Sequence, residues 1–313
     1  RYNIGFIAFS DENFGSDRRQ TEEFIRRIKE HDILWQVGGV RVRTVDPGLL
    51  KRMKDAGCVA VYYGMETGSP RILEIMEKKA TLQNNLDAAR WTREAGLFTI
   101  FQMVLAMPGE TPETVAETTD FLKNVTQDMD VAPRSLMSIN YIQALPGTPV
   151  YEYARHKKLI GSTLQAEEHY LLTISDIDAA DDTKFLNFTD CDTLTVRSWR
   201  KRIILDVMRH YYRRKNINPP AFGSFLLSRL KGAGAASAAD HHERQRQRVV
   251  REYQTGGYFN IQRDLGYDLI VAYLWPLRSF ALALSLLRDE WRRLPYTLFF
   301  AHLAEWARVR LNP

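Results

Sequence analysis

Cysteine is scarce in this sequence, which has only Cys58 and Cys191 among its 313 residues. Cys58 lies in an apolar segment that has the composition of a buried strand, so we do not expect a disulfide scaffold and a reducing interior is favoured. No signal peptide is visible. The one strongly apolar run, residues 269–287, contains Pro276 and Arg278, which a membrane-spanning helix accommodates poorly. This run predicts a helix packed on the domain or lying in a membrane interface rather than a span.

The sequence also lacks an initiator methionine. Residue 1 is arginine, and an apolar strand pattern begins within the next few residues. We therefore expect the natural N-terminus to lie upstream of Arg1. The length and a hydrophobic content of 45% are sufficient for one large domain with an appendage.

Positive charge is concentrated in one segment. Residues 197–251 hold 14 Lys/Arg and 3 Asp/Glu, a net charge of +11, whereas the remainder holds 29 Lys/Arg and 35 Asp/Glu, a net charge of −6. A solvated helical face explains this pattern most simply, and binding to anionic lipid, RNA or an acidic partner is the alternative. We do not expect DNA as a partner.

Strands and helices alternate in the first half of the chain. Apolar segments at residues 4–9, 34–42, 58–63, 98–105 and 136–142 predict five strands. Helices are predicted between them, beginning after Asp17, Asp46, Ser69, Thr81 and Thr111. This alternation implies right-handed βαβ crossovers and a parallel sheet. The predicted fold class is α/β, a barrel or part-barrel with its site at the carboxyl ends of the strands.

The stretch from residue 56 to residue 69 is the most informative part of this pattern. Residues 58–63 are apolar without alternation, as expected for a parallel strand that is buried on both faces. The strand is predicted to end at Gly64. Ser69 and Pro70 then predict the N-cap and the first position of the next helix.

The second half of the chain is predicted to be mostly helical. We divide the sequence into a part-barrel at residues 1–155, a helical extension at 156–230, a linker at 231–240 and a C-terminal helical region at 241–313. Within the extension, residues 195–215 predict an amphipathic helix whose other face is basic. Its apolar stripe consists of Trp199, Ile203, Ile204, Val207, Met208 and Tyr211.

Polar and glycine-containing turns follow the predicted strands and form the candidate site. It comprises Asp11, Glu12, Arg41, Glu66, Ser69 and the turn Pro108-Gly109-Glu110. Carboxylates there can bind an ammonium group or ribose hydroxyls, and an arginine can bind a carboxylate. Gly64 and Gly109 allow a ligand to approach the backbone. The set suits a zwitterionic, ribose-bearing ligand. The alternative is that Glu66 and Glu110 only stabilise helix N-termini.

Five segments in order resemble the radical S-adenosylmethionine (SAM) enzymes. They are IAFSDENF, WQVGGVRVRTVDPGLLKRMKDAGC, YYGMETGS, LAMPGET and ALPGTPVYE, and together they span about residues 1–155. The resemblance is strongest to the group with an N-terminal cobalamin-binding domain, which includes methyltransferases and the anaerobic magnesium-protoporphyrin ester cyclase. It implies a TIM-like part-barrel of six strands, of which the first is missing here.

The resemblance implies roles for the turns after the first and third predicted strands. The DENF turn is similar to the one that holds the amino group of SAM, which implicates Asp11 and Glu12. The GMETGS segment is similar to the turn that contacts the ribose and the methionine part of SAM, which implicates Gly64, Glu66 and Ser69.

Two further segments also acquire roles from the resemblance. The PGET segment is similar to the turn under the adenine, which implicates Pro108 and Gly109. Arg41 matches the arginine of an R-V-D-like strand, although Arg43 stands where the family more often has an acidic or polar residue. No catalytic residue is identified.

The sequence departs from the family at the iron–sulfur cluster. The family holds a 4Fe-4S cluster with three cysteines in a CxxxCxxC loop, and a cluster needs several neighbouring thiolates. Neither Cys58 nor Cys191 lies in such a loop, so we expect no metal ligand within this chain. The cysteine loop, the first strand and any cobalamin domain are expected before Arg1. The alternative is that the cluster has been lost.

The function expected from the resemblance is reductive cleavage of SAM to a 5′-deoxyadenosyl radical. The radical would serve a cobalamin-assisted methyl transfer or cyclisation on an unknown small-molecule or lipid-like substrate. An electron donor such as flavodoxin or ferredoxin is implied, and the expected location is the cytoplasm. Residues 197–313 predict peripheral binding to an anionic membrane, or else coverage of the barrel or of a dimer partner.

Two other functions remain open from the sequence. A radical SAM methylthiotransferase acting on tRNA would use the basic segment 197–251 to bind phosphates. A cluster-less relative that only binds a partner would not be an enzyme.

Overall fold

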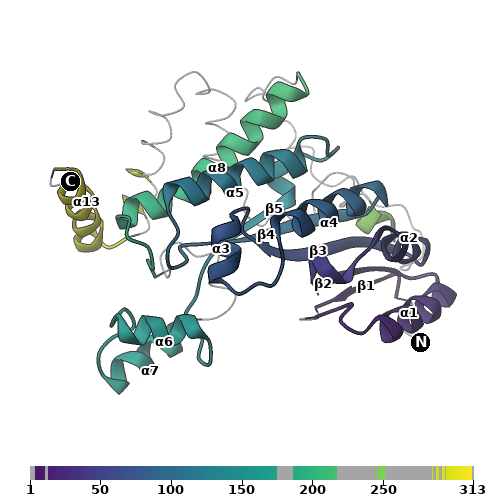
Figure 1. Cartoon of the computed structure of the whole chain (residues 1–313), viewed down its shortest axis with the longest axis horizontal. Coiled ribbons are helices and arrows are strands. Elements are labelled where there is room, and N and C mark those ends of the chain that lie inside the picture. The colour runs from purple at the N-terminus through teal and green to yellow at the C-terminus, as the bar shows by residue number, and fades with distance from the viewer. Residues whose placement is uncertain are drawn as a thin grey trace.

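A computed structural model describes residues 4–10, 13–174, 186–216, 243, 246–250, 284, 287–288, 291–292 and 294–311. Within this part of the chain, five parallel strands form one sheet in the order β1-β2-β3-β4-β5 (Figure 1). Each strand therefore pairs with the next strand along the sequence, through a helical crossover. The predicted parallel α/β architecture is confirmed.

The five strands lie where the sequence pattern predicts them. They are β1 (Phe6–Phe9), β2 (Leu34–Val40), β3 (Cys58–Glu66), β4 (Phe98–Leu105) and β5 (Met137–Tyr141). The prediction that the third strand ends at Gly64 is wrong. Gly64 pairs with Gln102 and Glu66 pairs with Met103, with a register shift between the two pairs. A glycine inside a strand marks a bulge here rather than an end.

Helices connect the strands and continue beyond the sheet. They are α1 (Arg18–Ile28), α2 (Pro47–Asp55), α3 (Pro70–Ile75), α4 (Leu82–Glu94), α5 (Pro112–Thr126), α6 (Pro149–His156), α7 (Leu164–Thr173), α8 (Thr193–Arg214) and α13 (Tyr296–Leu311). Short 3-10 helices occupy Lys29–His31, Val42–Thr44 and Pro133–Leu136. The predicted caps Asp17, Asp46 and Thr111 each accept a hydrogen bond from a backbone N–H in the first turn of their helix.

One face of the sheet is covered by α1, α2, α4, α5 and α8 (Figure 1). The strands direct fully buried aromatic side chains toward these helices, among them Trp35, Tyr63 and Phe101. On the opposite face, the hydroxyl of Tyr62 donates a hydrogen bond to Gln36 Oε1 at 2.8 Å. Val249, from the described residues 246–250, joins Ala60, Tyr62 and Ile100 in a small buried cluster on this face. The helices on the first face and the parallel strands together give the arrangement of a part-barrel.

Helix α8 confirms one part of its prediction and contradicts another. Its apolar stripe is buried as predicted. The basic face is not fully solvated, because Arg197, Arg200 and Lys201 are also buried. The Arg200 guanidinium lies 5.2 Å from the centre of the Tyr141 ring, and the Tyr141 hydroxyl donates to the Arg197 carbonyl at 3.1 Å. These cations belong to the packing of α8 on β5, which the sequence pattern did not indicate.

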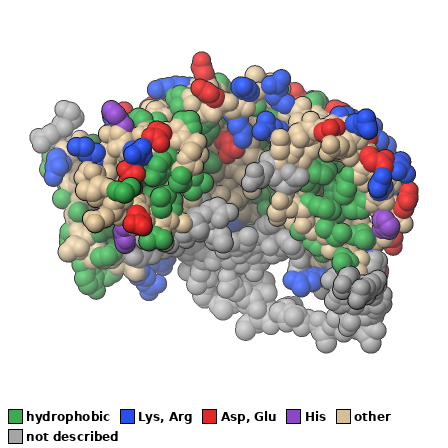
Figure 2. Space-filling model, turned by 90° about the horizontal axis from the view of Figure 1, so that it is seen from below, with side chains coloured by type: hydrophobic (Ala, Val, Ile, Leu, Met, Phe, Trp, Pro, Cys, Tyr) green, Lys and Arg blue, Asp and Glu red, His purple; other side chains and the backbone are tan. Residues whose placement is uncertain are grey.

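The outer surface carries charges of both signs. Seen from below, Lys/Arg and Asp/Glu side chains alternate along the rim of the described residues (Figure 2). Between α1 and α2, for example, Glu22 forms ion pairs with Arg18 at 2.9 Å and with Arg52 at 2.7 Å. None of the helices in the described part of the chain has the length and apolar character needed to cross a membrane. The predicted linker 231–240 lies outside the described residues, as does most of the apolar run 269–287.

Candidate functional site

The carboxyl ends of β2, β3 and β4 lie side by side. Val40 at the end of β2 pairs with Tyr63, and Glu66 at the end of β3 pairs with Met103 of β4. The structure therefore brings Arg41, Glu66 and the turn after β4 to one edge of the sheet, as the sequence predicted. Asp11 and Glu12 lie outside the described residues.

Glu66 occupies a strained position at the end of β3. Its φ angle is +63°, in the left-handed region that non-glycine residues rarely adopt. Its carboxylate Oε1 forms an ion pair with the ammonium of Lys78. A Cβ atom on Gly64 would lie 2.7 Å from this Oε1 and 3.4 Å from Lys78 Nζ. A side chain at position 64 would therefore displace the Glu66 carboxylate from this position, whereas the sequence nominated Gly64 for ligand approach to the backbone.

The turn after β3 is tied to two helices by buried hydrogen bonds. Thr118 of α5 contacts Thr67 Oγ1 at 2.9 Å and accepts from the Gly68 N–H at 3.0 Å. The Asn85 side chain of α4 donates to the Met65 carbonyl at 3.1 Å. A Cβ atom on Gly68 would lie 2.8 Å from the Thr118 Cα, so only glycine fits. These contacts hold the backbone around Glu66 in a fixed position.

Ser69 differs from its predicted role in one respect. It stands at the N-cap position of α3, but its side chain makes no capping hydrogen bond. The residue is fully buried, and its Oγ has no hydrogen-bond partner among the described residues. The Ser69 N–H instead donates to Thr67 Oγ1 at 3.1 Å. The predicted N-cap position of Ser69 is confirmed, but its buried hydroxyl does not cap the helix.

Glu110 organises the turn after β4. Its side chain is buried, and Oε2 accepts a hydrogen bond from the Ala106 N–H at 2.6 Å. The Glu110 N–H donates to the Met107 carbonyl at 3.0 Å. Burial raises the pKa of this carboxyl to about 8, and the hydrogen bonds from the Ala106 and Met107 amides oppose the rise only in part. Glu110 thus stabilises its own turn, whereas the alternative from the sequence was a charge at the N-terminus of α5.

Pro108 and Gly109 form the tip of this turn and are partly exposed. Gly109 has φ +78°, and a Cβ atom there would lie 3.0 Å from Ile75 Cδ1 at the end of α3. The turn after β4 therefore lies against α3, the helix that follows the Glu66 turn. The two turns that the sequence nominated form one continuous surface.

Arg41 follows β2 directly and is exposed. Its carbonyl accepts from the Thr44 hydroxyl at 2.8 Å, which fixes the backbone of the 3-10 turn. Its guanidinium has no hydrogen bond or ion pair within the described part of the chain, so it is available to an anionic group. Arg43, in contrast, donates to the Lys79 carbonyl at 2.8 Å.

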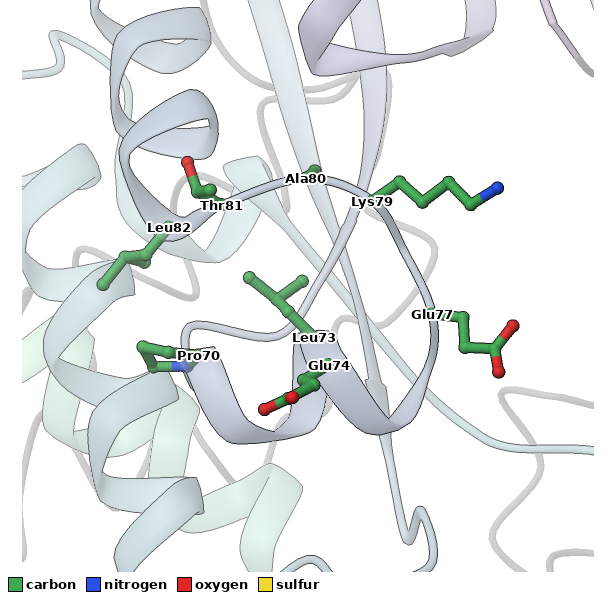
Figure 3. A pocket seen from close by; sticks show the side chains of 8 residues that line it. All are labelled: Pro70, Leu73, Glu74, Glu77, Lys79, Ala80, Thr81 and Leu82. Carbon is green, nitrogen blue, oxygen red and sulfur yellow. The ribbon is translucent and has the colours of Figure 1, made fainter.

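A pocket of about 530 Å³ lies beside this edge, between α3 and the start of α4 (Figure 3). Leu73 points into the loop formed by α3 and the following turn, while Glu77 and Lys79 point outward. The lining residues are Pro70, Leu73, Glu74, Glu77, Lys79, Ala80, Thr81 and Leu82. The residues predicted to bind SAM do not line it.

The described residues contain no cluster of three His, Cys, Asp or Glu side chains that could hold a metal ion. Cys58 is buried in β3, and desolvation raises the pKa of its thiol well above the usual range. Cys191 is half-buried, and burial also raises the pKa of its thiol. Both cysteines are thus kept as neutral thiols, which are poor metal ligands.

Residues 1–122 match the family model of the radical SAM superfamily. This part of the chain is similar to members of that superfamily. The chain is 34% identical over 161 residues to an uncharacterised methyltransferase of Pyrococcus horikoshii, a match that covers 51% of this chain and 33% of that protein. It is 32% identical over 123 residues to the anaerobic magnesium-protoporphyrin IX monomethyl ester cyclase of Cereibacter sphaeroides, covering 37% of this chain and 20% of that protein.

Solved structures were also found that are similar to part of this chain. The methyltransferase TsrM of Kitasatospora setae, solved with cobalamin and a 4Fe-4S cluster bound, aligns with a TM-score of 0.43 and 21% identity. The alignment covers 50% of this chain and 31% of that chain. By sequence, this chain matches only about a third of the length of the Pyrococcus methyltransferase and a fifth of the length of the cyclase.

Three residues that shape this edge of the sheet were not among the predicted site residues. Lys78 pairs with Glu66 across 12 positions, and Thr118 and Asn85 reach the Glu66 turn from later helices. None of them lies in a recognisable motif. Thr118 and Asn85 lie on helix faces that bury other threonines as well, so their residue types gave no distinguishing signal, and Lys78 gave none either.

Proposed function

We propose that the edge formed by β2, β3 and β4 binds SAM for reductive cleavage. The observation that carries the proposal is Glu66, held at the carboxyl end of β3 beside the turn after β4. Only Oε1 of its carboxylate contacts a described residue, so Oε2 remains as an acceptor at a partly exposed position. A ribose hydroxyl is a suitable donor for this oxygen.

The other residues of the edge complete the site. Arg41, whose guanidinium pairs with no residue in the described part of the chain, offers that group to the carboxylate of SAM. Pro108 and Gly109 present the backbone of the turn after β4, which is held rigid by Glu110, to the flat adenine ring. Gly64 has no side chain that would displace the Glu66 carboxylate. Asp11 and Glu12 are proposed to hold the amino group of SAM, as the family resemblance implies.

The residues of this chain do not fit an iron–sulfur cluster. The sequence contains two cysteines, and a radical SAM cluster requires three thiolates in one loop. Cys58 is also buried at the start of β3, away from the carboxyl ends of the strands. The proposal therefore requires cluster ligands from outside residues 1–313. When bound, the cluster would supply the electron that cleaves SAM to methionine and the 5′-deoxyadenosyl radical.

The reaction that follows cleavage is proposed from the relatives. They are named as methyltransferases and a cyclase, so we propose a cobalamin-assisted methyl transfer or a cyclisation on a small-molecule or lipid-like substrate. An electron donor such as flavodoxin or ferredoxin and a cytoplasmic location, peripheral at an anionic membrane, belong to this proposal. So does the division into a part-barrel, a helical extension, a linker and a C-terminal helical region.

Burial in α8 weakens the tRNA alternative. That alternative required the basic side chains of residues 197–251 to contact phosphates. Arg197, Arg200 and Lys201 are buried and cannot do so. The same burial removes three charges from a membrane-binding surface.

The test of the proposal is SAM binding by Glu66→Ala in the full-length protein. Loss of one charge-assisted hydrogen bond is expected to weaken binding by about 1.5–3 kcal/mol in calorimetric titration. Glu77→Ala is the matched control, because Glu77 is an exposed carboxylate on the neighbouring turn that points outward (Figure 3). Its affinity should equal that of the wild type. Unchanged SAM affinity in Glu66→Ala, or no 5′-deoxyadenosine from the reduced wild-type protein, contradicts the proposal.

A further inference from the structure

The turn between α3 and α4 has two strained residues on either side of Lys78. Glu77 has φ +50° and Lys79 has φ +51°, both in the left-handed region. Such conformations persist only where the surrounding structure holds them. Here the Lys78 N–H donates to the Leu73 carbonyl at 3.1 Å, and Arg43 donates to the Lys79 carbonyl at 2.8 Å. The turn is thus fixed at both its ends.

The result of this arrangement is that Lys78 reaches back to the end of β3. Its ammonium contacts Glu66 Oε1, and the Lys78 and Glu66 side chains are 33% and 20% exposed. The pair is therefore partly shielded from water, where a charge pair orients its members more strongly than it does on an open surface. Glu66 itself has a positive φ, so backbone strain is present on both sides of the contact.

We infer that Lys78 is a positioning residue for cofactor binding, acting through Glu66. By holding Oε1, Lys78 fixes the carboxylate so that Oε2 faces the ribose hydroxyls of SAM. Gly64 contributes by leaving room for both groups, since a Cβ atom there would contact both Glu66 Oε1 and Lys78 Nζ. The inference rests on the proposed SAM site and adds to it a residue that no motif contains.

The experiment is calorimetric titration of the full-length protein with S-adenosylhomocysteine, which cannot be cleaved. Lys78→Met should lower the affinity about tenfold, because Glu66 loses its orientation. Lys78→Arg should restore most of the affinity, since a guanidinium also pairs with a carboxylate. The matched control is Lys79→Met, which removes the same charge from the adjacent, exposed residue and should bind as the wild type does.

A double-mutant cycle separates positioning from a general structural role. If Lys78 acts through Glu66, the Glu66→Gln/Lys78→Met variant should bind no more weakly than Glu66→Gln alone. The wild type should also prefer S-adenosylhomocysteine to its 2′,3′-dideoxy analogue, and Lys78→Met should reduce that preference. Additive losses in the cycle, or wild-type affinity in Lys78→Met, overturn the inference.

Two further outcomes are distinguishable. A wild-type protein that does not bind S-adenosylhomocysteine overturns the proposed cofactor site and the inference with it. If Lys78→Met lowers the melting temperature, Lys78→Gln provides a polar replacement of similar length. If a folded Lys78→Gln variant prefers S-adenosylhomocysteine to the dideoxy analogue as strongly as the wild type does, the inference is overturned while the proposed cofactor site stands.

Discussion

Glu66 and Glu110 stand at the carboxyl ends of adjacent strands, and their surroundings differ. Glu66 is partly exposed and paired with Lys78, with one carboxylate oxygen left for a ligand. Glu110 is buried, and its carboxylate binds the backbone of its own turn. Burial raises the pKa of Glu110 to about 8, so this carboxyl is mostly protonated near neutral pH.

Position at a strand end therefore does not by itself make a glutamate a ligand-binding residue. The turn after β3 is held by side chains of other helices, Thr118 and Asn85, which leaves Glu66 available. The turn after β4 is held by its own glutamate, which is thereby used for structure. Measurements of stability and of SAM affinity on variants of both turns test this division.

The largest effect is expected from Glu110→Ala. Removing this carboxyl leaves the buried Ala106 and Met107 amides without a partner, which should lower the free energy of unfolding by about 3 kcal/mol. Denaturant unfolding measures the change. Glu110→Gln retains an acceptor oxygen, so its free energy of unfolding should fall clearly less. Equal stability of Glu110→Ala and the wild type would show that Glu110 is not a structural residue.

The pH dependence of stability should also reveal Glu110. Its pKa is about 8 in the folded protein, against 4.5 for a glutamate that is not buried, so the folded protein binds the extra proton between these values. The contribution of Glu110 to stability is therefore fully present at low pH and is lost as pH rises through this window, by about 2 kcal/mol between pH 6 and pH 8. Unfolding curves of wild type and Glu110→Gln, taken across that range, measure the difference. If the free energy of unfolding changes with pH equally in both proteins, Glu110 is not the group with the raised pKa.

Gly68→Ala should destabilise the turn after β3 by about 1–2 kcal/mol. The added Cβ would lie 2.8 Å from Thr118 Cα and 2.9 Å from the Glu117 carbonyl oxygen, so α5 and the turn must separate. SAM affinity should fall as well, because Glu66 moves with the turn. Gly38→Ala in β2 is the control, since its Cβ would find no atom closer than 3.8 Å. Equal melting temperatures for both variants would show that the turn is not held as described.

The smallest effect on stability is expected for Glu66→Ala, in contrast to its effect on SAM affinity. The Glu66–Lys78 pair is partly exposed, and such pairs contribute less than about 1 kcal/mol. Thermal unfolding should therefore be close to that of the wild type. A loss as large as that of Glu110→Ala would mean that both glutamates are structural.

Much of the fold followed from local patterns in the sequence. The strands, the helix starts at Asp17, Asp46 and Thr111, and the apolar stripe of α8 depend on periodicity and capping, which are properties of short segments. The exceptions came from long-range packing. The extension of β3 to Glu66 depends on pairing with β4, and the burial of Arg200 depends on the Tyr141 ring.

The turns of the candidate site could be predicted from the sequence, but the contacts that hold these turns in place could not. Arg41, Glu66 and Gly109 could be nominated because parallel strands bring their carboxyl ends to one edge. Local sequence could not show that Ser69 is buried, because burial depends on how segments that are distant in the chain pack around a residue.

The sequence by itself determined the parallel α/β order, the location of the candidate site and the absence of a cysteine triad from residues 1–313. These depend on composition and on patterns within short segments of the chain. Tertiary structure alone decided that Glu66 is partly exposed and paired with Lys78 whereas Glu110 is buried. The side chain of Lys78 crosses from a later turn to Glu66, while the burial of Glu110 raises its pKa. Both effects depend on distances between segments that the linear order of residues does not contain.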